Sequence, residues 1–171
     1  INGVGFESTN GGSWDFDGTN DYINCGTFST SYITLSTWVY RTSSAQNQGI
    51  CRKQSGWAIS QYNGTLQVAP GNRWWFYNTG YTIPLNTWVN ITYSYGDGFE
   101  NVYINGEAIW TSPLTGTIPT NSNMVRIGYD DNGWFWGGKI SGTLIYNRAL
   151  TADEVQQNYE ATKGKFLGQQ I

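Results

Sequence analysis

Apolar and polar residues alternate along short segments of this chain, and glycine, asparagine, proline or aspartate separates one segment from the next. Because successive side chains of a strand point to opposite faces, alternation with a period of two predicts β-strands. In residues 33–40, Ile33, Leu35 and Val39 share one face, and Trp38 and Tyr40 share the other. We therefore expect a strand here whose two faces can both make contacts.

Residues 88–95 alternate more strictly. Valine, isoleucine and two tyrosines form an apolar face, and Asn90, Thr92 and Ser94 lie opposite. We expect the apolar face to line a core and the polar face to be able to meet water. A tight hairpin follows, because Asn105-Gly106 supplies the two positive-φ positions of a type I′ turn between strands 102–104 and 107–110.

Further short strands are predicted at a spacing of about 8–12 residues, which is typical of a β-sandwich or barrel. They comprise residues 14–16, 22–25, 50–52, 57–60, 66–68, 125–127 and 140–146. Aromatic residues make up 16% of the chain, charged residues only 12%, and glycines number 22. This composition favours turn-rich sheets over amphipathic helices, so the sequence predicts a single all-β domain over residues 1–171.

One short helix is predicted near the end of the chain. Thr151 and Glu154 have the spacing of a capping box, in which each side chain accepts a hydrogen bond from the other residue's backbone N–H. The helix is expected over about 152–163, because Gly164 suits a C-terminal stop. The tail, residues 164–171, is expected to be a linker end or a docking arm that carries Phe166, Leu167 and Ile171.

The charge pattern argues against nucleic acid as a partner. Nine lysines and arginines against twelve aspartates and glutamates give a formal net charge of −3, and the only adjacent basic pair is Arg52-Lys53. Nucleic-acid binding needs clustered cations that face phosphates. We also expect no membrane insertion, because no run approaches the roughly 18 apolar residues of a spanning helix.

Only two cysteines, Cys25 and Cys51, are present. They are too few for a disulfide framework and wrongly spaced for a zinc site. Two buried free thiols are the favoured expectation, and a single bridge between them is the alternative.

Five separated segments carry a family resemblance, in order and over most of the chain. They are residues 14–23, 33–39, 86–93, 102–106 and 145–155. Together they resemble the laminin-G-like, concanavalin A-like lectin and glucanase superfamily, in its pentraxin-like branch found in secreted and viral surface proteins. The resemblance implies a jelly-roll of two packed antiparallel sheets.

Residues 147–166 are also similar to the end of such domains in structural proteins of marine bacteriophages and related viruses, which implies a virion location. The sequence departs from the family at one point. The family carries an Asp-Glu pair after the isoleucine of the last strand, but here Ile140 is followed by Ser141-Gly142. This difference removes two candidate calcium oxygens.

Enzymatic activity is not expected. The chain has no histidine, which excludes Ser-His-Asp and Cys-His nucleophilic systems. The related glucanases carry their carboxylates as Glu-x-Asp-x-Glu on one strand, and no such segment occurs here. The nearest acidic groupings are Asp15 with Asp17, Glu100 with Glu107, and Asp130-Asp131.

Calcium is the one cofactor that the residues suggest, because it prefers oxygen ligands from loops. The candidate ligands are Asp17, Asp21, Asp130 and Asp131. The alternative is that these residues only form turns, since each pair lies beside a glycine.

Two aromatic clusters are candidates for sugar binding, because flat rings stack on pyranoses while amide, carboxylate and guanidinium groups fix hydroxyls. The candidate residues are Arg73, Trp74, Trp75 and Tyr77 in the first cluster and Asn132, Trp134 and Trp136 in the second. Four successive aromatics cannot all point inward from one strand, so some rings should be exposed. The alternative is that the rings fill the core or a protein interface.

The sequence therefore predicts a non-enzymatic, lectin-like surface module on a virion or outside the cell, with a glycan and neighbouring subunits of an assembly as partners. A purely structural, assembly-stabilising protein without a sugar ligand is the alternative. A glycan-active hydrolase is the third possibility.

Overall fold

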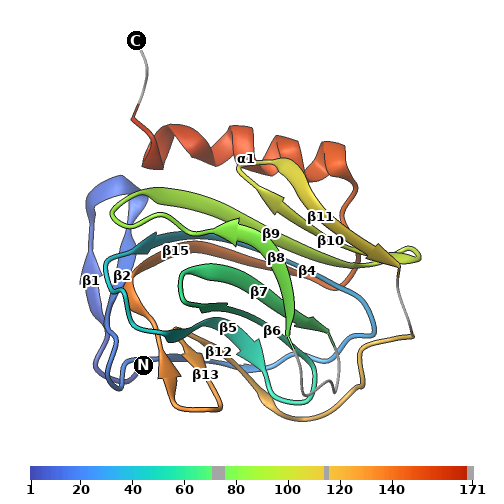
Figure 1. Cartoon of the computed structure of the whole chain (residues 1–171), viewed down its shortest axis with the longest axis horizontal. Coiled ribbons are helices and arrows are strands. Elements are labelled where there is room, and N and C mark those ends of the chain that lie inside the picture. Colours follow the sequence, from blue (N-terminus) through green and yellow to red (C-terminus); the bar gives the residue numbers. More distant parts are fainter. Residues whose placement is uncertain (71–75, 114–115, 169–171) are drawn as a thin grey trace.

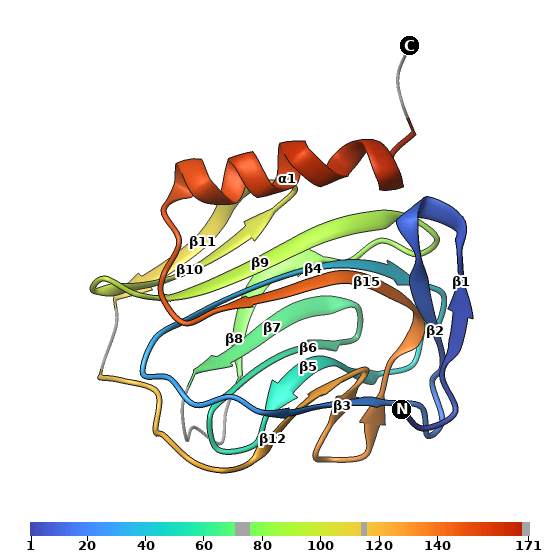
Figure 2. The ribbon, with the colours of Figure 1, turned by 180° about the vertical axis from the view of Figure 1, so that it is seen from behind.

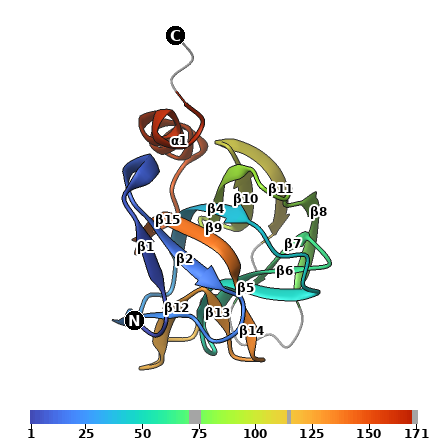
Figure 3. The ribbon, with the colours of Figure 1, turned by 90° about the vertical axis from the view of Figure 1, so that its left-hand side faces the viewer.

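The chain folds into a β-sandwich with a helix on its outside (Figure 1), described by a computed structural model for residues 1–70, 76–113 and 116–168. Over these residues the strands form two large antiparallel sheets and one small two-stranded sheet. The prediction of an all-β, two-sheet jelly-roll with a C-terminal helix is confirmed. Figure 3 shows the sandwich from the side, with the two sheets as separate layers.

The first sheet has seven strands in the part of the chain that is described. They are β1 (Gly5–Glu7), β2 (Ser13–Asp17), β15 (Gly137–Tyr146), β4 (Ile33–Arg41), β9 (Trp88–Gly96), β10 (Phe99–Ile104) and β11 (Glu107–Pro113), in their spatial order. A short 3-10 turn, η1 (Thr9–Gly11), connects β1 to β2.

The second sheet has six described strands. In spatial order they are β3 (Ile23–Thr27), β12 (Met124–Ile127), β5 (Asn47–Lys53), β6 (Trp57–Tyr62), β7 (Thr65–Pro70) and β8 (Tyr77–Thr82). The third sheet is the hairpin of β13 (Tyr129–Asp130) and β14 (Trp134–Phe135).

The core lies between the two large sheets and follows the predicted alternation. Ile33, Leu35 and Val39 of β4 are completely buried in it, whereas Trp38 belongs to a separate cluster on the opposite face of the strand. The predicted turn at Asn105-Gly106 is present, with φ values of 52° and 84°.

The polar face of β9 is buried, contrary to the expectation that it could meet water. Asn90, Thr92 and Ser94 are at most 3% exposed, because the helix α1 (Ala152–Phe166) and the segment leading into it lie across this sheet (Figure 2). Hydrogen bonds compensate the burial: the Thr92 hydroxyl donates to Ser36 at 2.9 Å, for example.

Helix α1 begins as predicted and ends later. The capping box of Thr151 and Glu154 is present, but the helix runs through Gly164 to Phe166 instead of ending at Lys163. The reason is that Phe166 packs on Trp38, so the first part of the expected docking arm is helical. Leu167 is 46% exposed, and Ile171 lies outside the described residues. No helix in the described ranges has the length and apolarity needed to cross a membrane.

Both cysteines are free thiols, and one of them is not buried. Cys51 lies in the core, where burial raises the pKa of its thiol. Cys25 is exposed, because β3 is the edge strand of the second sheet.

Candidate ligand-binding site

The β13–β14 hairpin lies on the outer face of the second sheet, against β5 (Figure 3). Gly128 precedes it with a φ of 80°, and its N–H donates to the Ile50 carbonyl at 2.8 Å. Gly49 permits the close approach, because a Cβ at that position would lie 2.3 Å from the backbone nitrogen of Asp130. The chain therefore places both short strands of the hairpin, β13 and β14, directly over β5.

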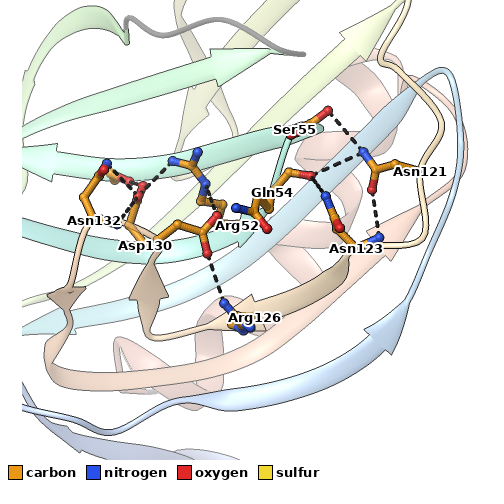
Figure 4. Close-up of polar contacts among 10 residues, drawn as sticks. Arg52, Gln54, Ser55, Asn121, Asn123, Arg126, Asp130 and Asn132 are labelled. Carbon is orange, nitrogen blue, oxygen red and sulfur yellow. Dashed lines mark hydrogen bonds and ion pairs between the residues drawn. The ribbon is translucent and has the colours of Figure 1, made fainter.

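Asp130 anchors this hairpin with a completely buried side chain. Its Oδ1 accepts a hydrogen bond from Arg52 Nη1 at 2.8 Å, and its Oδ2 accepts one from the Ser60 hydroxyl at 2.9 Å. Oδ1 also accepts from the Asn132 side chain at 3.2 Å (Figure 4). The buried charge is thus compensated by a guanidinium and by neutral donors, as a buried carboxylate requires.

Asp131 connects two arginines of neighbouring strands. Arg126 Nη1 donates to its Oδ1 at 3.0 Å. Arg52 Nε lies 3.0 Å from its Oδ2 as an ion pair without an aligned hydrogen bond. Arg52 and Arg126 face each other in the β5–β12 ladder, so two cations and two carboxylates form one neutral network under the hairpin.

A second polar cluster lies beside this network, where the segment before β12 crosses the end of β5 (Figure 4). The Lys53 ammonium is buried and donates to the carbonyl of Asn121 at 2.7 Å and to its side-chain oxygen at 2.6 Å. Burial lowers the pKa of Lys53. The Asn121 and Asn123 amides donate in turn to the Gln54 carbonyl, at 3.3 and 3.0 Å. These contacts hold the segment in place.

Half-buried aromatic rings surround the charge network on the protein surface. We call this the aromatic surface. It consists of five rings and one guanidinium that packs among them: Tyr22, Phe76, Tyr129, Trp134, Phe135 and Arg126. The centroids of Phe76 and Trp134 are 6.1 Å apart, and those of Tyr129 and Phe135 are 4.8 Å apart. The Arg126 guanidinium lies 5.4 Å from the Tyr129 centroid, a cation–π contact.

The predicted sugar-binding residues divide between this surface and the interior. Trp134 is half-buried on the aromatic surface, and Asn132 is exposed in the adjoining turn. Trp136 is completely buried in the core, so it cannot stack on a sugar. It lies between β14 and β15, where the chain passes from the hairpin into the first sheet. Tyr77 packs on Trp110 and the core, while Arg73, Trp74 and Trp75 lie outside the described residues.

The four predicted calcium ligands serve other contacts. Asp17 Oδ1 accepts from the backbone N–H groups of Thr19 and Asn20, at 2.7 and 3.2 Å, and buried Asp21 accepts from the Asp17 N–H at 2.9 Å. Arginines pair with Asp130 Oδ1 and with both oxygens of Asp131, and the Ser60 hydroxyl donates to Asp130 Oδ2. No three acidic or cysteine side chains of the described ranges gather as a metal site would require. Calcium binding by the four aspartates stays a prediction.

The other acidic groupings do not face each other across a groove. Asp15 and Asp17 are exposed on β2. Glu100 is buried and accepts a hydrogen bond from the Tyr93 hydroxyl at 3.1 Å, whereas Glu107 is exposed near the hairpin turn. Their ladder partners, Ser112 and Ile104, place them at opposite ends of the β10–β11 pair.

Arg52 and Arg126 are the functional candidates that the sequence did not identify. One signal was present: Arg126 stands between Val125 and Ile127, and Arg52 follows Cys51 in a strand. Because these apolar neighbours turn inward, the arginine side chains must reach the outer face. The partners of Arg52 could not be deduced, because Asp130 follows 78 residues later, with Asp131 next to it. Asp131 is only five residues from Arg126, but it meets that side chain only through the fold of the hairpin.

Comparison with known proteins agrees with this architecture. Residues 17–156 match the model of the Laminin_G_3 family, described as the concanavalin A-like lectin/glucanases superfamily. No curated protein matches the sequence.

Three similar solved structures illustrate the fold. Domain 4 of an extracellular arabinanase from Geobacillus stearothermophilus, in complex with arabinotriose, has a TM-score of 0.76 and 20% identity, over 92% of this chain and 81% of that one. A heptameric SAP-like pentraxin from Limulus polyphemus has a TM-score of 0.68 and 20% identity, over 84% and 79%. The receptor-binding domain of botulinum neurotoxin type G has a TM-score of 0.70 and 20% identity, over 94% of this chain and 45% of that one. The chain thus spans about half the length of the toxin domain.

Proposed function

The chain belongs to the concanavalin A-like lectin/glucanases superfamily, and from that premise we propose that it is a non-enzymatic glycan-binding module. One observation carries the proposal: Trp134 and Phe76 are half-buried neighbours on the outer face of the sandwich, and the exposed residue Asn132 lies in the adjoining turn. Aromatic faces stack on sugar rings, and amides bond to hydroxyls.

The aromatic surface is well anchored for this role. The hairpin that carries Trp134 is fixed by the buried Asp130 and its contacts with Arg52 and Ser60. A ring on such a support loses little conformational entropy when it binds a ligand. Support also comes from the arabinanase domain of the same fold, which was solved with arabinotriose.

The proposed site has the character of a weak binder. A shallow site with one or two rings provides affinity in the millimolar range, about −4 kcal/mol. Useful adhesion then needs many copies, which raise the effective concentration. We therefore place the module on an extracellular or virion surface, as a structural or decoration domain. Its resemblance to phage structural proteins over residues 147–166 supports the virion.

Catalysis has no support at this site. The carboxylates nearest to the rings, Asp130 and Asp131, are held by Arg52 and Arg126, whereas a glycosidase needs an acid and a base or nucleophile that are free to face the substrate. Arg52 and Arg126 neutralise these carboxylates without a metal ion, so binding should persist in a chelator such as EDTA.

The test is a glycan array probed with a multimer of the chain, followed by titration of any glycan that binds. Trp134→Ala should reduce binding at least about tenfold, the loss of one stacking contact. Phe99→Ala is the control, because Phe99 is an aromatic residue that is 51% exposed on β10 and lies outside the aromatic surface. Equal binding by wild type and Trp134→Ala would refute the proposal.

The alternative is that the aromatic surface packs on a neighbouring subunit and stabilises an assembly without a sugar. The heptameric pentraxin of the same fold is the observation that favours it. Sedimentation of the chain distinguishes the two functions, since Trp134→Ala would then dissociate an oligomer. A monomeric wild type that binds a glycan decides for the first function.

A further inference from the structure

A groove lies where helix α1 passes over the turn of the β10–β11 hairpin (Figure 2). Its volume is about 590 Å³, which falls within the range of about 300–1,000 Å³ that is typical of small-molecule sites. Strand β8 contributes Tyr81 to a third side of the groove. The lining includes no residue of the aromatic surface, so the groove is a separate feature of the molecule.

A β-bulge shapes the hairpin side of the groove. The ladder between β10 and β11 shifts its register between Val102 and Tyr103, which leaves Ile109 without a partner on β10. Bulges in edge strands redirect side chains, and Ile109 lines the groove with 38% of its surface exposed. The hairpin thus presents an apolar side chain to a ligand.

The helix side of the groove lies close against the hairpin turn. Gly106 permits this approach, because a Cβ at that position would collide with the Gln156 side chain. On the helix, Glu160 accepts a hydrogen bond from the Gln156 amide at 3.1 Å and pairs with Lys163 at 2.5 Å. The two charges of the helix wall therefore neutralise each other.

Three other lining residues keep polar groups unused. Among residues 1–70, 76–113 and 116–168, nothing bonds to the Glu107 carboxylate, the Tyr81 hydroxyl or the Asn105 side-chain nitrogen. Only the side-chain oxygen of Asn105 is engaged, by the Asn90 N–H at 2.9 Å. Burial raises the pKa of Tyr81, so its hydroxyl keeps its proton at neutral pH. An amide nitrogen donates, a carboxylate accepts and a phenol does both, so one cavity offers unused donors together with unused acceptors.

We propose that this groove binds a neutral sugar ring, as a second ligand site of the module. Sugar hydroxyls can donate to Glu107 and accept from Asn105, while a C–H face of the ring packs on Ile109. An ammonium ligand would satisfy the acceptors only. A carboxylate ligand would satisfy the donors only, and Glu107 would repel it. The proposal does not rest on the aromatic surface, because the two sites have no residue in common.

The first experiment follows two NMR signals during titration with arabinose, galactose, glucose and mannose in turn. The side-chain amide of Asn105 reports on the groove, and the indole N–H of Trp134 reports on the aromatic surface. At least one sugar should shift the Asn105 signal, with or without a response of Trp134. Methylammonium, a cation without hydroxyls, should leave the Asn105 signal in place.

Two results of this titration overturn the proposal. One is an Asn105 signal that none of the four sugars moves, even if Trp134 responds, since binding is then confined to the aromatic surface. The other is a methylammonium shift as large as that of the sugars, since the groove then binds cations. A shift at Asn105 without one at Trp134 supports the groove and counts against the aromatic surface alone.

The second experiment compares the dissociation constants of variants for the sugar that shifts Asn105. Glu107→Gln should weaken binding at least about fivefold, because hydroxyls bond more strongly to a charged acceptor than to an amide. Tyr81→Phe should weaken it about threefold, the loss of one neutral hydrogen bond. Asp153→Asn removes the same charge from an exposed position outside the groove and should bind like wild type. Wild-type affinity in Glu107→Gln, or an equal loss in Asp153→Asn, contradicts the proposal.

Discussion

Phe166 stacks on Trp38, with ring centroids 4.4 Å apart and an angle of 19° between the ring planes. The contact joins the last turn of α1 to the middle of β4, and Trp88 packs against the same phenyl ring at 4.9 Å. The Trp38 indole N–H also donates to Thr162 of the helix at 3.0 Å. Phe166 thus packs the end of the helix against Trp38 and Trp88 on the outer face of the first sheet.

We expect Phe166→Ala to destabilise the protein by about 3 kcal/mol, because truncation of a buried phenylalanine removes its transfer energy and leaves a cavity. The last turn of α1 should fray as well. Urea denaturation measures the first effect, and hydrogen exchange of the helix amides measures the second.

Leu167→Ala is the matched control for this prediction. Leu167 is the next residue but is 46% exposed, so its truncation should cost less than about 0.5 kcal/mol. Similar losses in the two variants would show that Phe166 does not anchor the helix.

The sequence predicted the interior strands well, because alternation is strongest where one face is buried. Residues 33–40 and 88–95 both became central strands of the first sheet. The prediction failed where a second layer covers the sheet: Asn90 and Thr92 are polar and yet buried under α1. Periodicity gives the two faces of a strand but not what covers the outer one.

The candidate site was only partly predictable, for a physical reason. Asp130 and Trp134 were selected from their residue types and their local clusters, yet their roles depend on where the hairpin lies. Gly49, far earlier in the chain, allows that placement, and nothing local connects it to Asp130. Trp136 shows the same limit. It follows Trp134 by two residues, so a period of two would place both rings on one face, yet Trp134 is half-buried at the surface and Trp136 lies in the core.

Asp130→Ala should destabilise the protein by about 3 kcal/mol. Removal of one partner leaves the buried Ser60 hydroxyl unpaired and weakens the compensation of Arg52, which is the costly way to break a buried pair. Chemical denaturation gives the free energy. Glu160→Ala is the control, since Glu160 forms an exposed ion pair with Lys163, and such pairs contribute about 1 kcal/mol or less. A loss no larger than that of the control would disprove the anchoring role.

Gly49→Ala and Gly164→Ala should change stability in opposite directions. At position 49 the new methyl group would meet the backbone of Asp130, so the hairpin must move, at a cost of about 1–3 kcal/mol. At position 164 no atom lies within 4 Å, and alanine in a helix interior should stabilise by about 0.5–1 kcal/mol. Thermal and urea unfolding of both variants test this. A neutral Gly49→Ala would mean that the hairpin does not depend on close contact with β5.

Glu154 makes the start of α1 sensitive to acid. Hydrogen bonds from the Arg148 guanidinium and from the Thr151 N–H lower the pKa of Glu154 from 4.5 to about 2. A carboxylate whose folded pKa is depressed contributes stability above its unfolded pKa, and the contribution disappears as the pH falls through the folded value. The stability gap between wild type and Glu154→Gln should therefore be largest above about pH 5 and should close toward about pH 2. Unfolding free energies measured across this interval test the prediction, because the remaining carboxylates are common to both proteins and cancel in the difference. A gap that stays constant with pH would mean that the Arg148–Glu154 pair and the capping box do not stabilise the helix through the charge of Glu154.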